Sequence, residues 1–315
     1  MESIRKRSAD KQSVLYFLVL PTLLILFGYL FYPYPAPETV DILIYIPLFL
    51  GLILLSIGFI RSFLKQKNTG STFKIYGWII FAFFWSTQPK SLYFGEGGDV
   101  FNATVCIIGV YVLFYLAYQE WISIKKDDYI GCLNWIAGAS AIAGLIYFGV
   151  EKTPLGPFLI EIVANQSSLL LNSIIGDVSV EGTNIFYKGR YVVSIIFACT
   201  AMQSMVLFIG MIGALEKVDI KRKLIGGFIT VVPIYLLNLL RNALVGFLLA
   251  KNIADFNLAH NVIAKIGSLI ALIIILYGLT KVIPEIFDEI ICLTDLYKRD
   301  GPLERFIKKH FLGEK

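Results

Sequence analysis

Charged residues are scarce in this chain of 315 residues. They make up 16% of the sequence, whereas an ordinary soluble domain has roughly 25%. Hydrophobic residues, by contrast, reach 57%. Most of the chain is therefore expected to lie in lipid.

Histidine and cysteine are also scarce. One of the two histidines, His310, lies in a basic tail, which excludes a haem group held by two histidines inside the membrane. The four cysteines form no CxxC pair and have no metal-ligand spacing; they are Cys106, Cys132, Cys199 and Cys292. We therefore expect no disulfide framework, no zinc site or other metal, and no cofactor.

Long apolar stretches are abundant. A helix needs about 20 apolar residues to cross a bilayer core, and about eight stretches approach that length. They run over residues 14–32, 40–62, 74–88, 100–119, 131–150, 191–215, 224–250 and 260–281. The third is the shortest. The sequence thus predicts an all-α polytopic membrane protein of about eight transmembrane helices, with residues 1–315 in one integral membrane domain.

Lysine and arginine predict the orientation, because cytoplasmic loops are enriched in them. With eight helices and a cytoplasmic N-terminus, 21 of the 28 basic residues, Lys74 among them, fall in cytoplasmic segments. Five fall in external segments, and Arg241 and Lys265 lie within the membrane. Both termini are therefore predicted in the cytoplasm, and residues 282–315 form a basic tail there.

The longest external segment, residues 151–190, lies between helices five and six. Its part FLIEIVANQSSLLLNSIIG has apolar residues near helical spacing, which indicates an amphipathic helix along the outer membrane surface. The following VSVEGTNIFYKGR alternates weakly around Gly182, which favours a small hairpin or an irregular cap. This segment is predicted to cap the external face.

Arg241 is the clearest candidate for chemistry. An ionisable side chain at the centre of a membrane helix costs roughly 2.5–3.5 kcal/mol or more and is by default a functional-site hypothesis. In IYLLNLLRNALVGFLLA it lies about 13 Å below the external end, so a side chain that snorkels to the outer headgroups is an alternative that fits this depth only in part. Asn238, one turn earlier on the same face, is a hydrogen-bond partner or a supporting residue. Lys265 contacts lipid phosphate or a substrate carboxylate, or else snorkels.

Cys199 is predicted at a similar depth, about 12 Å, in the helix over residues 191–215. A single membrane cysteine is usually a small packing residue. Gln203, four residues later, is expected on the same helical face, where it either joins helices or donates in an active site.

His260 opens the last helix on the external side. Cys199, Arg241 and His260 would then share one level in the outer half of the bilayer. A thiol can act as nucleophile, a histidine can move its proton to a leaving amine, and an arginine can stabilise thiolate and oxyanion. An acyl-thioester shielded from water could pass to an amine or hydroxyl of a lipid headgroup.

The run ACTAMQS around Cys199, the LLRN around Arg241 and the helix opened by His260 resemble the exosortase and archaeosortase superfamily, and its archaeosortase branch in particular. The resemblance covers residues 160–280. It implies a sortase-like cysteine transpeptidase with Cys199 as nucleophile, Arg241 as stabiliser and His260 as general acid and base. Some archaeosortases carry arginine at the third position.

The resemblance also implies the partners. The substrates would be secreted proteins, S-layer glycoproteins included, that end in a PGF motif, a hydrophobic helix and a basic tail. Cleavage outside the cell membrane would be coupled to attachment to an archaeal membrane lipid, with plain hydrolysis as a variant. Nucleic acid is not an expected partner.

Two other functions stay open. A transporter could use Arg241 and Lys265 for an anion, although we see none of the repeated halves that transporters show. A lipid-modifying enzyme could bind phosphate with Arg241, and its cysteine would then be incidental.

Overall fold

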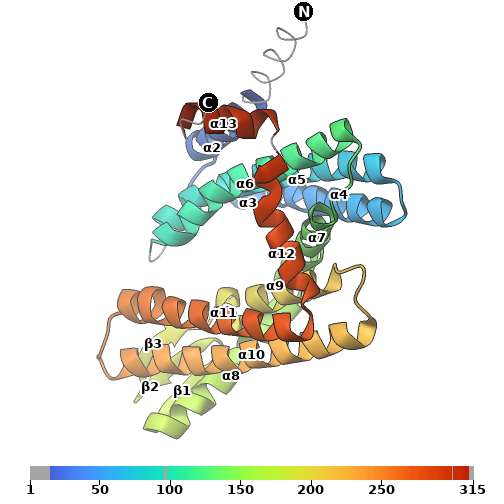
Figure 1. Ribbon diagram of the computed structural model, residues 1–315. Helices are drawn as coiled ribbons and strands as arrows, with labels where there is room; N and C mark the ends of the chain where they lie inside the picture. Colours follow the sequence, from blue (N-terminus) through green and yellow to red (C-terminus); the bar gives the residue numbers. More distant parts are fainter. Residues whose placement is uncertain (1–14, 96–97, 300, 312–315) are drawn as a thin grey trace, which may run out of the picture. The chain divides into compact units, whose positions relative to one another are not determined.

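The computed structural model describes residues 15–95, 98–299 and 301–311. The fold is that of an all-α polytopic membrane protein with one small sheet (Figure 1). The chain divides into two compact units, which are Met1–Ala141 with Asp288–Lys315, and Ile142–Phe287. The predicted cytoplasmic N-terminus, with the basic residues of positions 1–14, lies outside the described residues.

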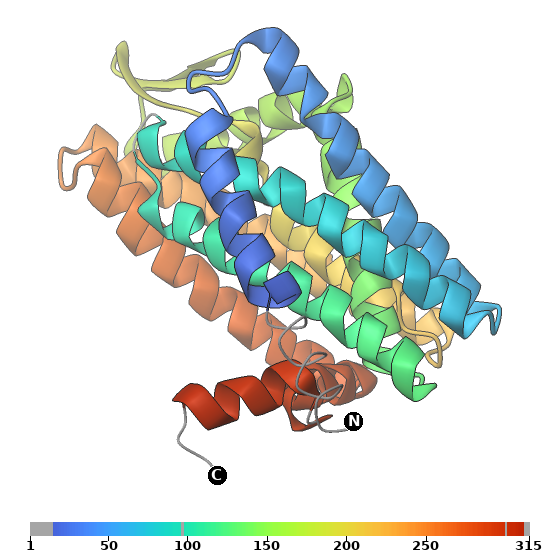
Figure 2. The same ribbon diagram turned by 90° about the horizontal axis from the view of Figure 1, so that it is seen from above.

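The first unit is built of helices. They are η1 (Leu15–Val19), α2 (Leu20–Phe31), α3 (Glu38–Leu43), α4 (Tyr45–Phe63), α5 (Lys67–Phe94), α6 (Val100–Lys126), the first part of α7 (Gly131–Glu151), most of α12 (Glu285–Thr294), η4 (Asp295–Arg299) and α13 (Pro302–Phe311). Helices α4, α5 and α6 pack side by side, as Figure 2 shows.

Glycines bring α4 and α5 into close contact. Gly51 and Gly58 on α4 are seven residues apart, as are Gly70 and Gly77 on α5, so each pair lies on one helix face. A Cβ atom on Gly58 would lie 2.8 Å from the Gly70 carbonyl oxygen, and one on Gly51 would lie 3.1 Å from that of Gly77. Small residues permit such backbone approach between membrane helices.

A buried ion pair joins α5 to α6. The Lys74 ammonium lies 2.7 Å from the Glu120 carboxylate, and both side chains are 1% exposed. Lys74 also donates to Asn134 Oδ1 at 3.3 Å. Lys74, which was predicted in a cytoplasmic segment, lies within helix α5, and its partner is far away in the sequence, so that no local pattern reveals the pair.

A disulfide bond joins Cys132 of α7 to Cys292 of α12. The expectation that the cysteines form no disulfide was wrong for this pair. The two residues are 160 positions apart, so spacing carried no sign of it. Nearby, the Arg299 guanidinium binds the Asp128 carboxylate through two hydrogen bonds of 2.7 and 2.8 Å, which further fastens η4 to the loop before α7.

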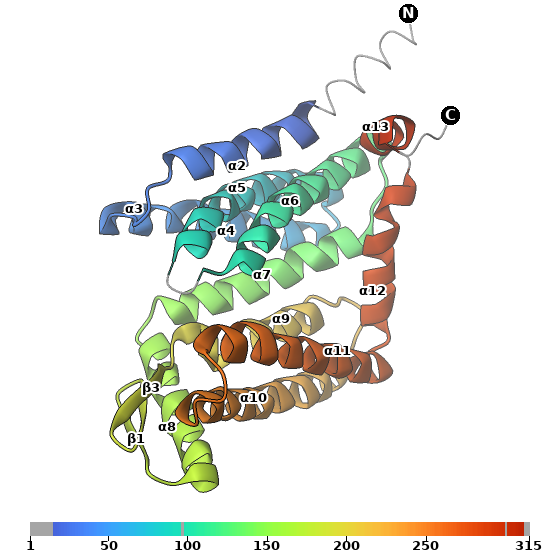
Figure 3. The ribbon, with the colours of Figure 1, turned by 90° about the vertical axis from the view of Figure 1, so that its left-hand side faces the viewer.

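The second unit holds the sheet and the remaining helices. They are the rest of α7, α8 (Leu155–Ile175), β1 (Val178–Glu181), β2 (Asn184–Tyr187), β3 (Arg190–Ser194), η2 (Phe197–Thr200), α9 (Met202–Gly213), α10 (Ile220–Ala250), η3 (Asn257–Ala264) and α11 (Lys265–Val282). Figure 3 shows the sheet beside α8, and the sheet also contacts α10.

The sheet is antiparallel, in the order β1-β2-β3. Lys188 and Gly189, between β2 and β3, both have positive φ, as a two-residue type I′ turn requires. Gly182, between β1 and β2, also has a positive φ. The predicted hairpin is confirmed, but β3 takes residues that were predicted to begin the sixth transmembrane helix.

Six helices of the described residues are long and apolar enough to cross a membrane, by length and composition. Five correspond to predicted spans and begin at Glu38, Val100, Gly131, Ile220 and Asn257. The sixth is α8, which was predicted to lie along the outer surface. The first predicted span is the shorter apolar helix Tyr16–Phe31. The third lies within α5, which is long but less apolar.

Candidate active site

Cys199 lies in a short 3-10 turn, Phe197–Thr200, which we call the Cys199 turn. Thr200 Oγ1 donates to the Phe197 carbonyl at 2.7 Å and accepts from the Met202 N–H at 3.3 Å. Ala201 has φ 60° and separates this turn from α9. The predicted helix over residues 191–215 was therefore wrong, because a left-handed alanine leaves no mark in an apolar pattern.

The break at Ala201 also changes the place of Gln203. The expectation that it shares a helical face with Cys199 assumed an unbroken helix, and that assumption was wrong. Gln203 lies in the first turn of α9 and is exposed.

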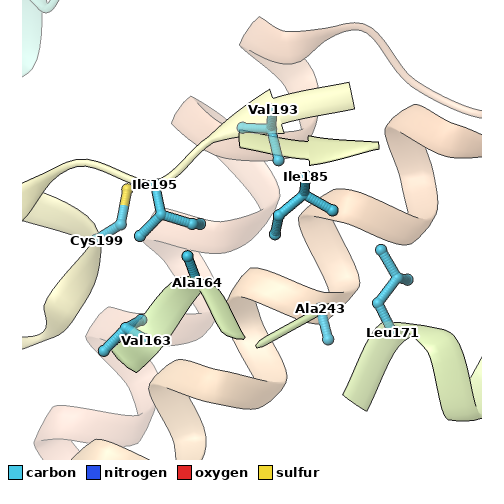
Figure 4. Packing of buried hydrophobic residues seen from close by; sticks show 8 residues of the cluster. All are labelled: Val163, Ala164, Leu171, Ile185, Val193, Ile195, Cys199 and Ala243. Carbon is cyan, nitrogen blue, oxygen red and sulfur yellow. The ribbon is translucent and has the colours of Figure 1, made fainter. Parts of the chain in front are cut away.

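Cys199 is 7% exposed and belongs to the hydrophobic core of the second unit. Figure 4 shows this core, to which α8, the sheet, the Cys199 turn and α10 contribute. Its buried members are Val163, Ala164, Leu171, Ile185, Val193, Ile195, Cys199 and Ala243. The cysteine is thus held by packing from several elements that are distant in sequence.

Two asparagines of α10 hold the Cys199 turn through hydrogen bonds to its backbone. Asn238 Nδ2 donates to the Cys199 carbonyl oxygen at 2.8 Å, and Asn242 Nδ2 donates to the same oxygen at 3.0 Å. Both asparagines are buried. Sequence reasoning named Asn238 but missed Asn242, although its position four residues later on the same helix face was a usable signal.

Arg241 lies between these asparagines on α10. It is close enough to Cys199 for the two groups to interact electrostatically. Its Nε atom is buried and has no hydrogen-bond partner among the residues that the structure describes. A buried N–H donor that stays unused is costly, and a guanidinium with such a donor is suited to an anion or to a carbonyl oxygen that gains negative charge.

His260 lies in η3, a π-helix, and its ring stacks on Phe256 with centroids 5.0 Å apart. The neighbouring Ala259 packs in a buried cluster with Val245, one turn beyond Arg241 on α10. The half-buried Lys265 begins α11. The fold therefore brings Cys199, Asn238 and Arg241 together, and it anchors the His260 segment on the same helix.

Polar contacts at the end of α10 anchor the sheet that precedes the Cys199 turn. Arg190 donates to Asn252 Oδ1 at 3.1 Å and to the Ala250 carbonyl at 3.0 Å. Lys251 donates to the Tyr187 hydroxyl at 2.8 Å, and this hydrogen bond lowers the pKa of Tyr187. Since β3 leads into the Cys199 turn, these contacts help to set its position on α10.

Comparisons with known proteins cover this whole region. Residues 133–277 match the family model described as transmembrane exosortase. The chain is 24% identical to archaeosortase A of Haloferax volcanii, over 70% of this chain and 84% of that protein. Both matches support an exosortase or archaeosortase type of protein. All the predicted site residues fall within the range that matches the family model. No solved structure matches the chain.

Proposed function

We propose that this chain is a membrane cysteine transpeptidase. It cleaves the C-terminal sorting signal of secreted proteins outside the cell and transfers the new carboxyl end to a membrane lipid. One observation carries the proposal: the Cys199 turn is fastened to α10 beside Arg241, whose buried Nε has no partner among the described residues.

The reaction begins when His260 accepts the Cys199 proton. The thiolate then attacks the scissile carbonyl carbon, forming a C–S bond, while Arg241 stabilises the oxyanion. His260 returns the proton to the leaving amine as the C–N bond breaks. A lipid hydroxyl or amine next gives a proton to His260 and attacks the thioester, so that a C–O or C–N bond forms. The Cys199 thiolate leaves and is ready for another cycle.

The proposed substrate rests on the resemblance to archaeosortases. We propose secreted proteins, S-layer glycoproteins among them, that carry a PGF motif, a hydrophobic helix and a basic tail. With the basic tail in the cytoplasm, the PGF motif would lie at the external face. The active site would face the external half of the bilayer, and both termini of the enzyme would be cytoplasmic. Gln203 and Lys265 are candidate contacts to the substrate.

Processing of a reporter tests this function. The reporter ends in a PGF motif, a hydrophobic helix and a basic tail, and it is expressed with wild type, Cys199→Ala or Cys106→Ala. Cys106 is the matched control because it is the other free cysteine of the described chain. We expect Cys199→Ala to abolish cleavage and Cys106→Ala to leave it unchanged.

The mass of the processed reporter separates the chemistries. A lipid adduct on the new carboxyl end supports transfer, whereas a free carboxylate indicates hydrolysis. Full processing by a folded Cys199→Ala protein would refute the cysteine mechanism and would favour a lipid-modifying enzyme or a transporter based on Arg241.

A further inference from the structure

The Cys199 carbonyl needs hydrogen-bond donors from outside its own segment. In an uninterrupted helix a carbonyl accepts from the N–H four residues later. Here the left-handed Ala201 interrupts the chain, and the bond that starts α9 runs from the Met205 N–H to the Ala201 carbonyl. A buried carbonyl without a donor is costly, so the turn depends on side chains of another element.

The donors come from α10. Asn238 and Asn242, 7% and 5% exposed, both donate to this carbonyl. Asn242 also contacts Ser167 Oγ of α8 at 3.4 Å, and Ser167 is fully buried. Hydrogen bonds in such an apolar surrounding are strong and directional. We call Asn238 and Asn242 the amide clamp.

Arg241 takes no part in the amide clamp, which consists of Asn238 and Asn242 alone. It lies one residue before Asn242 and three after Asn238, so the three side chains lie on neighbouring parts of one helix surface. The amides hold the backbone of the Cys199 turn, while Arg241 keeps an unused buried donor. Helix α10 therefore sets the position of the cysteine relative to the arginine.

We propose that Asn242 is a positioning residue, which acts by holding the Cys199 carbonyl so that the thiol stays in register with Arg241. This inference rests on the proposed function for its effect on catalysis. Its effect on the thiol itself can be measured without any substrate.

The first test is alkylation of the purified full-length protein by iodoacetamide, followed at Cys199 by mass spectrometry with Cys106 as internal reference. Asn242→Ala removes one of the two hydrogen bonds to the Cys199 carbonyl. The turn should then open more often and expose the Cys199 thiol, which is buried in the wild type. We expect the ratio of Cys199 to Cys106 alkylation to rise at least about fivefold, in keeping with the loss of one buried hydrogen bond.

Thr230→Val is the matched control. Thr230 is also fully buried on α10, and its hydroxyl donates to the Gly226 carbonyl of its own helix, away from the Cys199 turn. This variant should leave the alkylation ratio unchanged. If Asn242→Ala does not fold, Ser167→Ala removes the second contact of Asn242, and a rise of about twofold is expected.

The second test is reporter processing. Asn242→Ala should lower kcat about 10-fold or more and change KM less than twofold, because misplacing a nucleophile affects the chemical step. In an Arg241→Gln background, Asn242→Ala should lower kcat by a smaller factor, because both residues act on the arrangement of the Cys199 thiol and the Arg241 guanidinium.

The outcomes separate the two ideas. An unchanged alkylation ratio in folded Asn242→Ala overturns the amide clamp, whatever the activity. A raised ratio together with full activity of Cys199→Ala keeps the clamp as a device that orders the turn and overturns the transpeptidase. A raised ratio with lowered kcat supports both.

Discussion

The buried ion pair of the first unit leads to a quantitative prediction. Lys74 and Glu120 are each 1% exposed and their charged atoms are 2.7 Å apart. Removing one partner leaves the other charge buried and uncompensated, which costs about 3–5 kcal/mol in comparable pairs. We expect Lys74→Met and Glu120→Leu each to lower the free energy of unfolding by that amount.

The double variant is expected to be far milder. Lys74→Met combined with Glu120→Leu removes both charges, and replacing a buried pair by apolar residues is often neutral or stabilising. Asn134 loses the Lys74 donor at the same time, which costs about 1–3 kcal/mol. The free energy of unfolding of the double variant should thus lie within about 2 kcal/mol of wild type. Its loss would be far smaller than the sum of the two single losses, which corresponds to a large coupling energy between the two residues.

Tryptophan fluorescence isolates the relevant unit. The four tryptophans, Trp78, Trp85, Trp121 and Trp135, all belong to the first unit. Unfolding of the full chain in mixed micelles with increasing SDS therefore reports on that unit alone. A loss below about 1 kcal/mol for either single variant would show that water reaches the pair and would refute the reasoning from burial.

Three further predictions concern packing, covalent links and pH. Gly70→Ala should cost about 1–3 kcal/mol in the same unfolding assay, because the added Cβ would lie 2.9 Å from a backbone oxygen of α4. Alkylation of the unfolded chain followed by mass measurement should find two more free thiols after reduction than before, owing to the Cys132–Cys292 bond. Glu285→Gln should lower stability near neutral pH, because hydrogen bonds from Arg222 lower the pKa of Glu285. That loss should fade as the pH falls from about 4.3 through the lowered pKa, where the wild-type carboxylate becomes protonated.

Each of these has a control. Gly131→Ala, in open space at the start of α7 in the same unit, should be neutral or stabilising by up to about 1 kcal/mol, and an equal loss at both glycines would contradict the packing argument. An equal thiol count with and without reductant would contradict the disulfide. For Glu285, a loss that persists well below pH 4 would show that the side chain stabilises by its shape and not by its charge.

Much of the architecture could be predicted from local sequence. The thickness of a bilayer sets the length of an apolar stretch, and five of the predicted spans coincide with helices long and apolar enough to cross. The hairpin was visible because Gly182 separates two short strands. Arg241 was recognised because an ionisable side chain inside a membrane helix is costly, and Asn238 because helical periodicity puts it one turn earlier on the same face.

The details around Cys199 were not predictable in this way. Ala201 adopts a left-handed conformation that alanine rarely takes, so the break before α9 had no local sign. The partners of the Cys199 carbonyl come from α10, about forty residues later. The reach of Asn242 to both Cys199 and Ser167 depends on how α8, α10 and the sheet pack together.

By itself, the sequence determined a membrane chain with several spanning helices and a short set of candidate residues, because composition and periodicity are properties of neighbouring positions. Only the tertiary structure decided which distant residues meet. It paired Lys74 with Glu120 and Cys132 with Cys292, and it fastened the Cys199 turn to α10. These contacts follow from packing of whole elements, a long-range property that no local pattern encodes.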